Sequence, residues 1–264
     1  MTRVTIKALQ KLRDDGVKIA VLTCYDASFA AMLDAAGLDS LLIGDSLGMV
    51  LQGHDTTLPV TLADMAYHTR CVARGSKRSF LVTDMPFGSY QESPQQAFRS
   101  AAELMAAGAQ MVKLEGGAEF ADTIRFLAQR GVPVCGHLGL TPQSVHQFGG
   151  YRVQGKGEDA EKKLIEDAME LEAAGAGLLV LEAIPAGLGE QVTRRLHIPT
   201  IGIGAGPGCS GQVLVLHDML DVFPGKKARF VRNFMKGASG IADAAERYVR
   251  AVRDGSFPAE EHSF

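Results

Sequence analysis

The chain has 264 residues, and 46% of them are hydrophobic, which is enough for one sizeable core. Its 27 Lys and Arg residues nearly balance 30 Asp and Glu residues, so no basic surface indicates nucleic-acid binding. The N-terminus lacks an apolar signal core, no stretch approaches the roughly 18 apolar residues of a membrane span, and four widely spaced cysteines suggest reduced, buried thiols. We therefore expect a cytoplasmic protein of one domain, residues 1–264, with small-molecule ligands and without nucleic-acid or membrane partners.

Apolar runs and helix-length segments alternate along the chain. A short helix is predicted first, at residues 5–15. Eight strands are predicted at residues 19–26, 41–43, 80–84, 111–115, 133–139, 177–182, 199–206 and 212–218. Helices are predicted at residues 28–37, 61–73, 93–108, 118–130, 159–174, 188–196, 230–235 and 241–252. This order predicts an α/β fold, a (β/α)8 TIM barrel with a short N-terminal helix; a doubly wound sheet is the alternative, because sequence alone does not show closure.

Four of the predicted strands end at an acidic residue or within two residues of one. These acids are Asp45, Asp84, Glu115 and Glu182. Parallel strands bring their carboxyl ends to one face, where the ligands of α/β folds bind. Four converging acids repel one another unless a cation is present or their pKa values are strongly raised. Seven histidines without zinc-site spacing, beside oxygen donors, favour a hard cation such as Mg²⁺. Asp45 taken alone is better explained as a cap of the following turn, and the recurrence of strand-end acids favours a functional role.

Other polar residues lie beside these acids. Ser46 follows Asp45 and offers a hydrogen-bond donor. Lys113 points to the same side of its strand as the acid two residues later, so it forms a buried ion pair or holds an anionic substrate. His137 lies at the mouth of the fifth strand, where it has either a structural or a functional role. The glycines of residues 202–208 are consistent with a phosphate site or with close packing of strands.

Seven motifs in order make the chain resemble a known family. They are GDSLG at 44–48, QGHD at 52–55, MVKLEGG at 111–117, VCGHLGLTPQS at 134–144, FGGY at 148–151, LVLE at 179–182 and IGIGAG at 201–206. Together they resemble the ketopantoate hydroxymethyltransferase family over essentially the whole chain. The resemblance implies transfer of a hydroxymethyl group from 5,10-methylenetetrahydrofolate to 3-methyl-2-oxobutanoate. This reaction gives 2-dehydropantoate and opens pantothenate biosynthesis. The resemblance also implies a barrel fold, Mg²⁺ and a homodecamer.

The resemblance implies roles for the metal and substrate residues. Asp45 and Asp84 match the direct metal ligands and also lie against the substrate. Glu115 matches the third acidic group at the metal. Ser46 and Lys113 match the residues that hold the carboxylate of the oxo acid.

The remaining implied roles concern proton transfer. Glu182 matches the general base, and His137 matches a residue in contact with the substrate. Removal of the hydrogen beside a ketone gives an enolate, which Mg²⁺ stabilises by binding the keto and carboxylate oxygens. Two alternatives stay open: a Mg²⁺-dependent lyase or mutase of the phosphoenolpyruvate mutase/isocitrate lyase type, which needs no folate, and a barrel that binds a small acid without catalysis.

Overall fold

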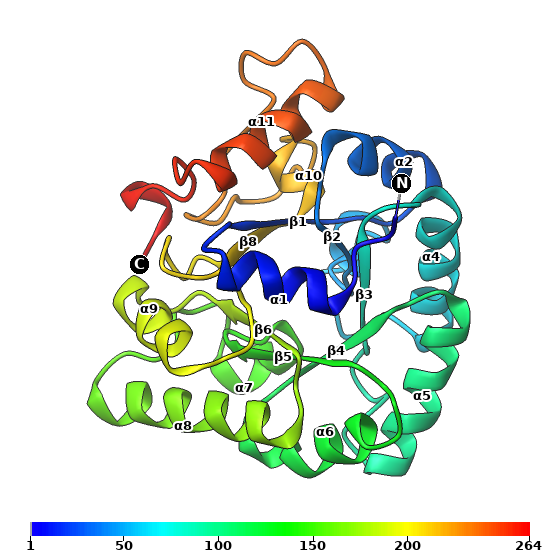
Figure 1. Cartoon of the computed structure of the whole chain (residues 1–264), viewed down its shortest axis with the longest axis vertical. Coiled ribbons are helices and arrows are strands. Elements are labelled where there is room, and N and C mark those ends of the chain that lie inside the picture. The colour runs from blue at the N-terminus through cyan, green and yellow to red at the C-terminus, as the bar shows by residue number, and fades with distance from the viewer. Residues whose placement is uncertain (1) are drawn as a thin grey trace.

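The computed structural model describes residues 2–264 and has a closed barrel of eight parallel strands at its centre (Figure 1). The strands are β1 Ile19–Thr23, β2 Ser40–Ile43, β3 Phe80–Asp84, β4 Met111–Glu115, β5 Val134–Gly139, β6 Leu178–Glu182, β7 Thr200–Ile203 and β8 Gly211–Leu214. Each strand pairs with the next, and β8 pairs with β1 through Ile19–Gly211 and three further positions. The predicted barrel is confirmed, and closure excludes the doubly wound sheet.

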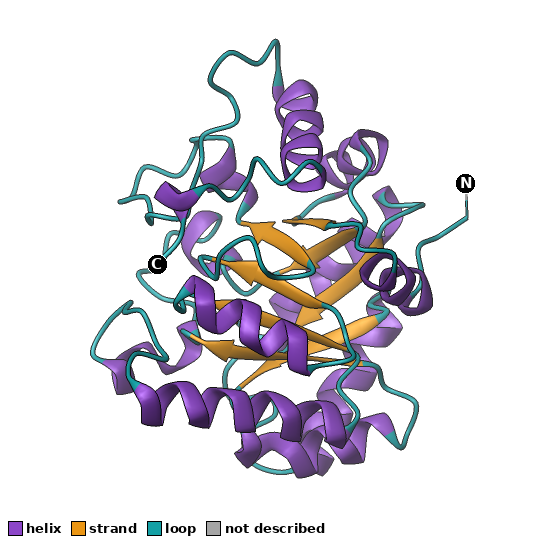
Figure 2. Cartoon of the chain, turned by 60° about the vertical axis from the view of Figure 1, so that its left-hand side comes forward, coloured by secondary structure: helices purple, strands orange, loops and turns teal. Residues whose placement is uncertain are grey.

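Helices surround the barrel, as Figure 2 shows. The longer ones are α1 Ile6–Asp14, α2 Ala27–Ala36, α4 Leu62–Gly75, α5 Pro94–Ala107, α6 Ala121–Ala128, α8 Glu158–Ala174, α9 Ala186–Arg195 and α11 Ile241–Arg253. Short helical turns are α3 Leu47–Val50, η1 Ala118–Phe120, η2 Pro142–Ser144, α7 Val145–Phe148, α10 Leu216–Met219 and η3 Glu260–His262. Within residues 2–264, no helix combines the length and the apolar character needed to span a bilayer.

Local sequence signals explain where several helices begin and end. The predicted N-terminal helix is α1, whose Leu9 is buried in the core. The helix predicted from residue 28 begins at Ala27 and is capped by Asp26, since the Asp26 carboxylate accepts hydrogen bonds from the amides of Ser28 and Phe29. The helix ends at Gly37, which has a left-handed φ of 93°.

Several predicted elements differ in the structure. The strands expected over residues 19–26 and 199–206 are shorter, because β1 stops at Thr23 and β7 at Ile203. The eighth strand was expected over residues 212–218, but β8 stops at Leu214 and α10 follows. The amide of Leu216 donates a hydrogen bond to the Thr23 hydroxyl, which turns the chain away from the strand direction. The helix expected at residues 230–235 is absent from this described segment. The Asn233 side-chain oxygen instead accepts hydrogen bonds from the backbone amides of Met235 and Lys236. This local pattern competes with a helix.

The cysteine side chains are free thiols, as predicted. Cys24, Cys135 and Cys209 are buried, while Cys71 is half-buried. Burial raises the thiol pKa to about 12 for Cys24 and Cys135 and to about 11 for Cys209. These three cysteines are therefore neutral packing residues at ordinary pH.

Candidate functional site

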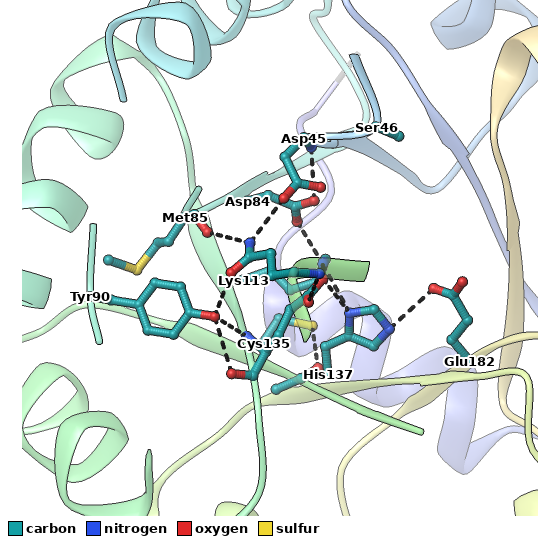
Figure 3. A network of polar contacts seen from close by, with 12 residues as sticks. Asp45, Ser46, Asp84, Met85, Tyr90, Lys113, Cys135, His137 and Glu182 are labelled. Carbon is teal, nitrogen blue, oxygen red and sulfur yellow. Dashed lines mark hydrogen bonds and ion pairs between the residues drawn. The ribbon is translucent and has the colours of Figure 1, made fainter. Parts of the chain in front are cut away.

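The four predicted carboxylates converge at the C-terminal ends of their strands (Figure 3). Asp45, Asp84, Glu115 and Glu182 line one cavity of about 780 Å³. The first three are buried, whereas the Glu182 side chain is 15% exposed. The structure therefore places three acids at the bottom of the cavity and one acid in its more open part.

Asp45 and Asp84 are neighbours because β2 and β3 pair in register. The Asp45 amide donates to Asp84 Oδ2 at 3.0 Å, while Asp45 Oδ2 accepts from Gln143 Nε2 at 2.9 Å. Burial raises the pKa of Asp45 well above its ordinary value, and the charges of Asp84 and Glu115 raise it further. A cation at this position would relieve that repulsion.

Lys113 is a buried cation among these acids. Its Nζ lies 2.8 Å from Asp84 Oδ1 and 4.0 Å from Glu115 Oε1. Burial alone would lower the pKa of Lys113, but the charges of Asp84, Glu115 and Asp45 outweigh it and raise the pKa above its ordinary value. Lys113 is therefore an ammonium ion at neutral pH, and it forms the ion pair that its position in the strand suggested.

Glu115 is held by protein groups through both carboxylate oxygens. Oε2 accepts from the Gln143 amide at 2.9 Å, and Oε1 lies 3.1 Å from His137 Nδ1. Burial raises the pKa of Glu115 to about 7, against the opposing effects of the Lys113 charge and the Gln143 hydrogen bond. Its charge therefore changes near neutral pH.

His137 lies between two acids from different strands. Nδ1 contacts Glu115 Oε1 and lies 3.3 Å from Lys113 Nζ. Nε2 faces Glu182 Oε2 at 3.3 Å without hydrogen-bond alignment. Burial lowers the pKa of His137, and the Lys113 charge adds to the effect. The imidazole is therefore neutral at pH 7, and one ring reaches both acids.

Gln143 and Tyr90 complete the site and received no role from the sequence. The Gln143 amide group donates to Asp45 Oδ2 and to the Met85 carbonyl, both at 2.9 Å. Its Oε1 accepts from the Tyr90 hydroxyl at 2.8 Å, and that hydroxyl also contacts the backbone of Glu115. Gln143 therefore ties the ends of β2, β3 and β4 together. The available signal was its place in the short turn that directly follows β5, within the VCGHLGLTPQS motif.

Ser46 lies beside the buried cluster at the cavity wall. It is half-buried, and its hydroxyl is 3.0 Å from the Tyr25 hydroxyl. Thr57, which the sequence did not single out, lines the same cavity with a buried hydroxyl that has no partner among residues 2–264. Both hydroxyls are placed to contact a small polar ligand.

The glycine run after β7 serves close packing rather than a phosphate cradle. A side chain on Gly202 would contact Cys209, and one on Gly206 would lie 2.5 Å from Ala186. Gly204 has a φ of +62° and faces Phe230. Of the two roles that the sequence left open, the structure supports packing.

The carboxylates of the site suit Mg²⁺, because this ion needs few ligands from the protein. Within residues 2–264, no three His, Cys, Asp or Glu side chains form a metal-binding group by themselves. Mg²⁺ commonly takes only one or two protein carboxylates and completes its octahedron with water and substrate oxygens. Asp45 and Asp84 offer that pair. Glu115, with both oxygens engaged, fits as a partner of bound water.

Sequence comparison identifies relatives over nearly the whole chain. The sequence model of the family described as ketopantoate hydroxymethyltransferase matches residues 3–260. The 3-methyl-2-oxobutanoate hydroxymethyltransferases of Dechloromonas aromatica (strain RCB) and Azoarcus sp. (strain BH72) are each 67% identical over 262 residues. The alignments cover 99% of this chain and 96% and 97% of those relatives.

Solved structures with low sequence identity share the fold. A putative phosphonomutase from Burkholderia cenocepacia J2315 has a TM-score of 0.65 at 17% identity, covering 82% of this chain and 94% of that one. A 2,3-dimethylmalate lyase, a PEP mutase/isocitrate lyase superfamily member, has a TM-score of 0.57 at 16% identity, covering 81% of each chain. These likenesses concern the barrel alone.

Proposed function

The chain belongs to the ketopantoate hydroxymethyltransferase family and has 3-methyl-2-oxobutanoate hydroxymethyltransferase activity, and we propose that the acid-lined cavity is its active site. The co-substrate is 5,10-methylenetetrahydrofolate, and the reaction belongs to pantothenate biosynthesis. The 67% identity decides against the lyase or mutase and against a barrel without catalysis, because the fold by itself is shared with enzymes of other chemistry. The observation that carries the site proposal is the convergence of four strand-end acids with Lys113 and His137 on one cavity.

Asp45 and Asp84 would hold Mg²⁺ in this proposal, with Glu115 ordering a water molecule beside it. The support is their adjacency and the raised pKa of Asp45, which a cation would reverse. When bound, Mg²⁺ stabilises the negative charge that develops on the keto oxygen of the substrate. Asp45 and Asp84, held by Gln143 and Lys113, keep their orientation before substrate arrives.

Lys113, Ser46 and His137 orient the oxo acid. Lys113 is the buried ammonium nearest the metal-binding acids, so it attracts the substrate carboxylate and the developing enolate charge. The Ser46 hydroxyl, beside the Tyr25 hydroxyl, donates to the same anionic end. His137 is neutral and can donate one N–H to a substrate oxygen without adding charge.

Glu182 is the general base in this proposal. It comes from β6, whereas the metal-binding acids come from β2 and β3, so it approaches the substrate from another side. Its carboxylate takes the proton from the carbon beside the ketone, and the C–H electron pair forms the enolate double bond. Water breaks the two C–N bonds of the folate's methylene bridge, which releases tetrahydrofolate and leaves the methylene carbon as a formaldehyde equivalent whose oxygen comes from the water. The enolate carbon attacks that carbon, and the oxygen takes up the proton that Glu182 removed and becomes the hydroxyl group.

Deuterium exchange tests the base directly. Proton NMR follows loss of the methine signal of 3-methyl-2-oxobutanoate in D₂O with Mg²⁺, for the wild type, Glu182→Gln and the exposed control Glu170→Gln. We expect Glu182→Gln to slow exchange by about 10²–10⁴-fold, the usual contribution of a general base. Calorimetry should show unchanged binding of the oxo acid. Exchange by Glu182→Gln at the wild-type rate would show that another group removes the proton.

We also propose the homodecameric assembly and the cytoplasmic location that the sequence resemblance implies. The support for the assembly is membership of the family alone. Light scattering on the purified protein, read against the chain mass of 28.1 kDa, counts the subunits. A mass of one or two chains would refute the decamer.

A further inference from the structure

A second cavity lies beside α11, away from the acid-lined one. Its volume is about 370 Å³, and the two cavities share no lining residue. Its charged lining residues come from the segment before α11, from α11 itself and from the position after it; they are Arg232, Lys236, Arg247, Arg250 and Asp254. We call this cavity the basic hollow. It concentrates four cations around one acid on a chain whose formal charge is −3.

Most cations of the basic hollow have no protein partner. Arg247 is the exception, because its Nε and one terminal nitrogen each lie 3.0 Å from a carboxylate oxygen of Asp243. The side chains of Arg232, Lys236 and Arg250 form no ion pair and donate no hydrogen bond within residues 2–264. With the single carboxylate of the lining counted against them, these three unpaired cations leave the basic hollow with a charge of +2.

The fold brings these charges together from two directions. Arg247 and Arg250 are three residues apart on α11, so their like charges share one face of the helix and repel each other. Asp254 lies on the same face, and hydrogen bonds from Ser256 lower its pKa. The charges of Arg232 and Arg250 lower that pKa further, which places both guanidinium groups near this carboxylate. One acid cannot neutralise cations on both sides of the basic hollow.

The backbone that carries the cations is anchored to the core. Phe234 is buried at the base of the basic hollow, and its ring meets Tyr248 and Phe257 edge to face with centroids 5.4 and 5.5 Å away. The Asn233 side chain holds the following turn through its bonds to two backbone amides. The Arg232 guanidinium lies 4.8 Å from the Phe234 ring centroid. The basic hollow is therefore formed before a ligand arrives, which lowers the entropy cost of binding.

We propose that the basic hollow is a second binding site of this protein and that it takes a diphosphate group. Guanidinium groups bind phosphate oxygens through paired N–H bonds, and a diphosphate offers oxygens to cations on both sides of the basic hollow. A single carboxylate carries one charge and would leave part of the +2 unpaired. Neither 3-methyl-2-oxobutanoate nor methylenetetrahydrofolate contains phosphate, so the ligand is additional to the two substrates.

The expected size follows from exposed ion pairs. One such pair changes a dissociation constant by up to about fivefold, and salt weakens it. Loss of Arg232 and Lys236 together should therefore weaken diphosphate binding by up to about 25-fold at low ionic strength. The difference between the wild type and the variant should shrink in high salt, because both lost pairs are exposed to solvent.

Calorimetry with inorganic pyrophosphate tests the proposal on the full chain, without Mg²⁺ because this ion binds the probe itself. The test variant is Arg232→Gln with Lys236→Gln. The matched control is Arg152→Gln with Lys226→Gln, which removes the same two residue types from the lining of the acid-lined cavity. We expect the wild type and the control to bind pyrophosphate alike and the test variant to bind at least about fivefold more weakly.

Two further measurements sharpen the result. Arg250→Gln removes an unpaired cation from α11 instead, so it should weaken binding as well, and thermal unfolding checks that each variant is folded. ADP carries the same diphosphate group and should lose affinity in the same variants. Tighter binding of ADP than of pyrophosphate would identify a nucleotide as the source of the group, and equal binding would identify the free anion.

Two results would overturn the inference: no binding of pyrophosphate by the wild type, or wild-type affinity in the Arg232→Gln, Lys236→Gln variant. Light scattering on the same samples covers another use of a basic surface. Loss of subunits by this variant, with a wild type that ignores pyrophosphate, would assign the basic hollow to a contact between copies of the chain. The titrations contain neither oxo acid nor folate, so their failure would leave the deuterium-exchange test of Glu182 untouched.

Discussion

Replacement of Glu115 by glutamine should make the protein more stable at alkaline pH when Mg²⁺ is absent. Glu115 is 4% exposed, and its pKa is raised from 4.5 to about 7, so the folded state holds a proton that the unfolded state releases. Because folding raises the pKa of this carboxyl group, the contribution of protonated Glu115 to the free energy of unfolding is fully present below pH 4.5. It is lost as the pH rises through about 7. A difference of about 2.5 units corresponds to roughly 3 kcal/mol of lost stability above pH 7. Glutamine has no ionisable carboxyl group, so the Glu115→Gln variant lacks this pH dependence.

Denaturant unfolding from pH 5 to 8 measures this effect at one fixed protein concentration. Between these limits the wild type should lose roughly 2–3 kcal/mol relative to Glu115→Gln. The control Glu103→Gln, an exposed position on α5, should follow the wild type. Parallel profiles for the wild type and Glu115→Gln would refute the argument that Glu115 is protonated by burial.

Addition of Mg²⁺ extends the same experiment to the metal proposal. A cation held by Asp45 and Asp84 favours ionised carboxylates, so saturating Mg²⁺ should return most of the lost stability at pH 8. Glu115→Gln should gain less, because it has less buried negative charge to compensate. Equal gains in the two proteins would show that the metal does not act on this cluster.

Two further substitutions probe the support of the site. Gln143→Leu removes the hydrogen bond to Asp45, so calorimetry should show Mg²⁺ binding weakened by about 10–100-fold, as for other residues that orient a metal ligand; unchanged affinity would contradict the positioning role. Gly139→Ala places a side chain 2.2 Å from the Glu182 carbonyl at a φ of +94°, so thermal unfolding should show a loss of at least about 2 kcal/mol. Gly131→Ala, with φ +81° and no neighbour within 4 Å, should cost about 1 kcal/mol, and equal losses would rule out the clash.

The barrel and its acidic end could be predicted because both follow from local patterns. An apolar run closed by an acid recurs at Asp45, Asp84, Glu115 and Glu182, and parallel strands bring such positions to one face whatever their spacing in sequence. The overlong eighth strand was wrong because a distant contact acts on the backbone there. The bond from Leu216 to the Thr23 hydroxyl spans 193 positions, and no pattern near residue 216 contains it.

The charge state of the site was less predictable than its residues, because it depends on distances between strands. Lys113 and His137 are 24 positions apart, yet their 3.3 Å contact helps to keep the imidazole neutral. Gln143 reaches Asp45 over 98 positions, so an uncharged side chain orients a carboxylate that we propose to bind the metal. An amide of this kind looks like any turn residue in sequence. Gln143 matters because the η2 turn places it over the ends of three strands, β2, β3 and β4. Its hydrogen bonds there fix the orientation of the acids relative to one another.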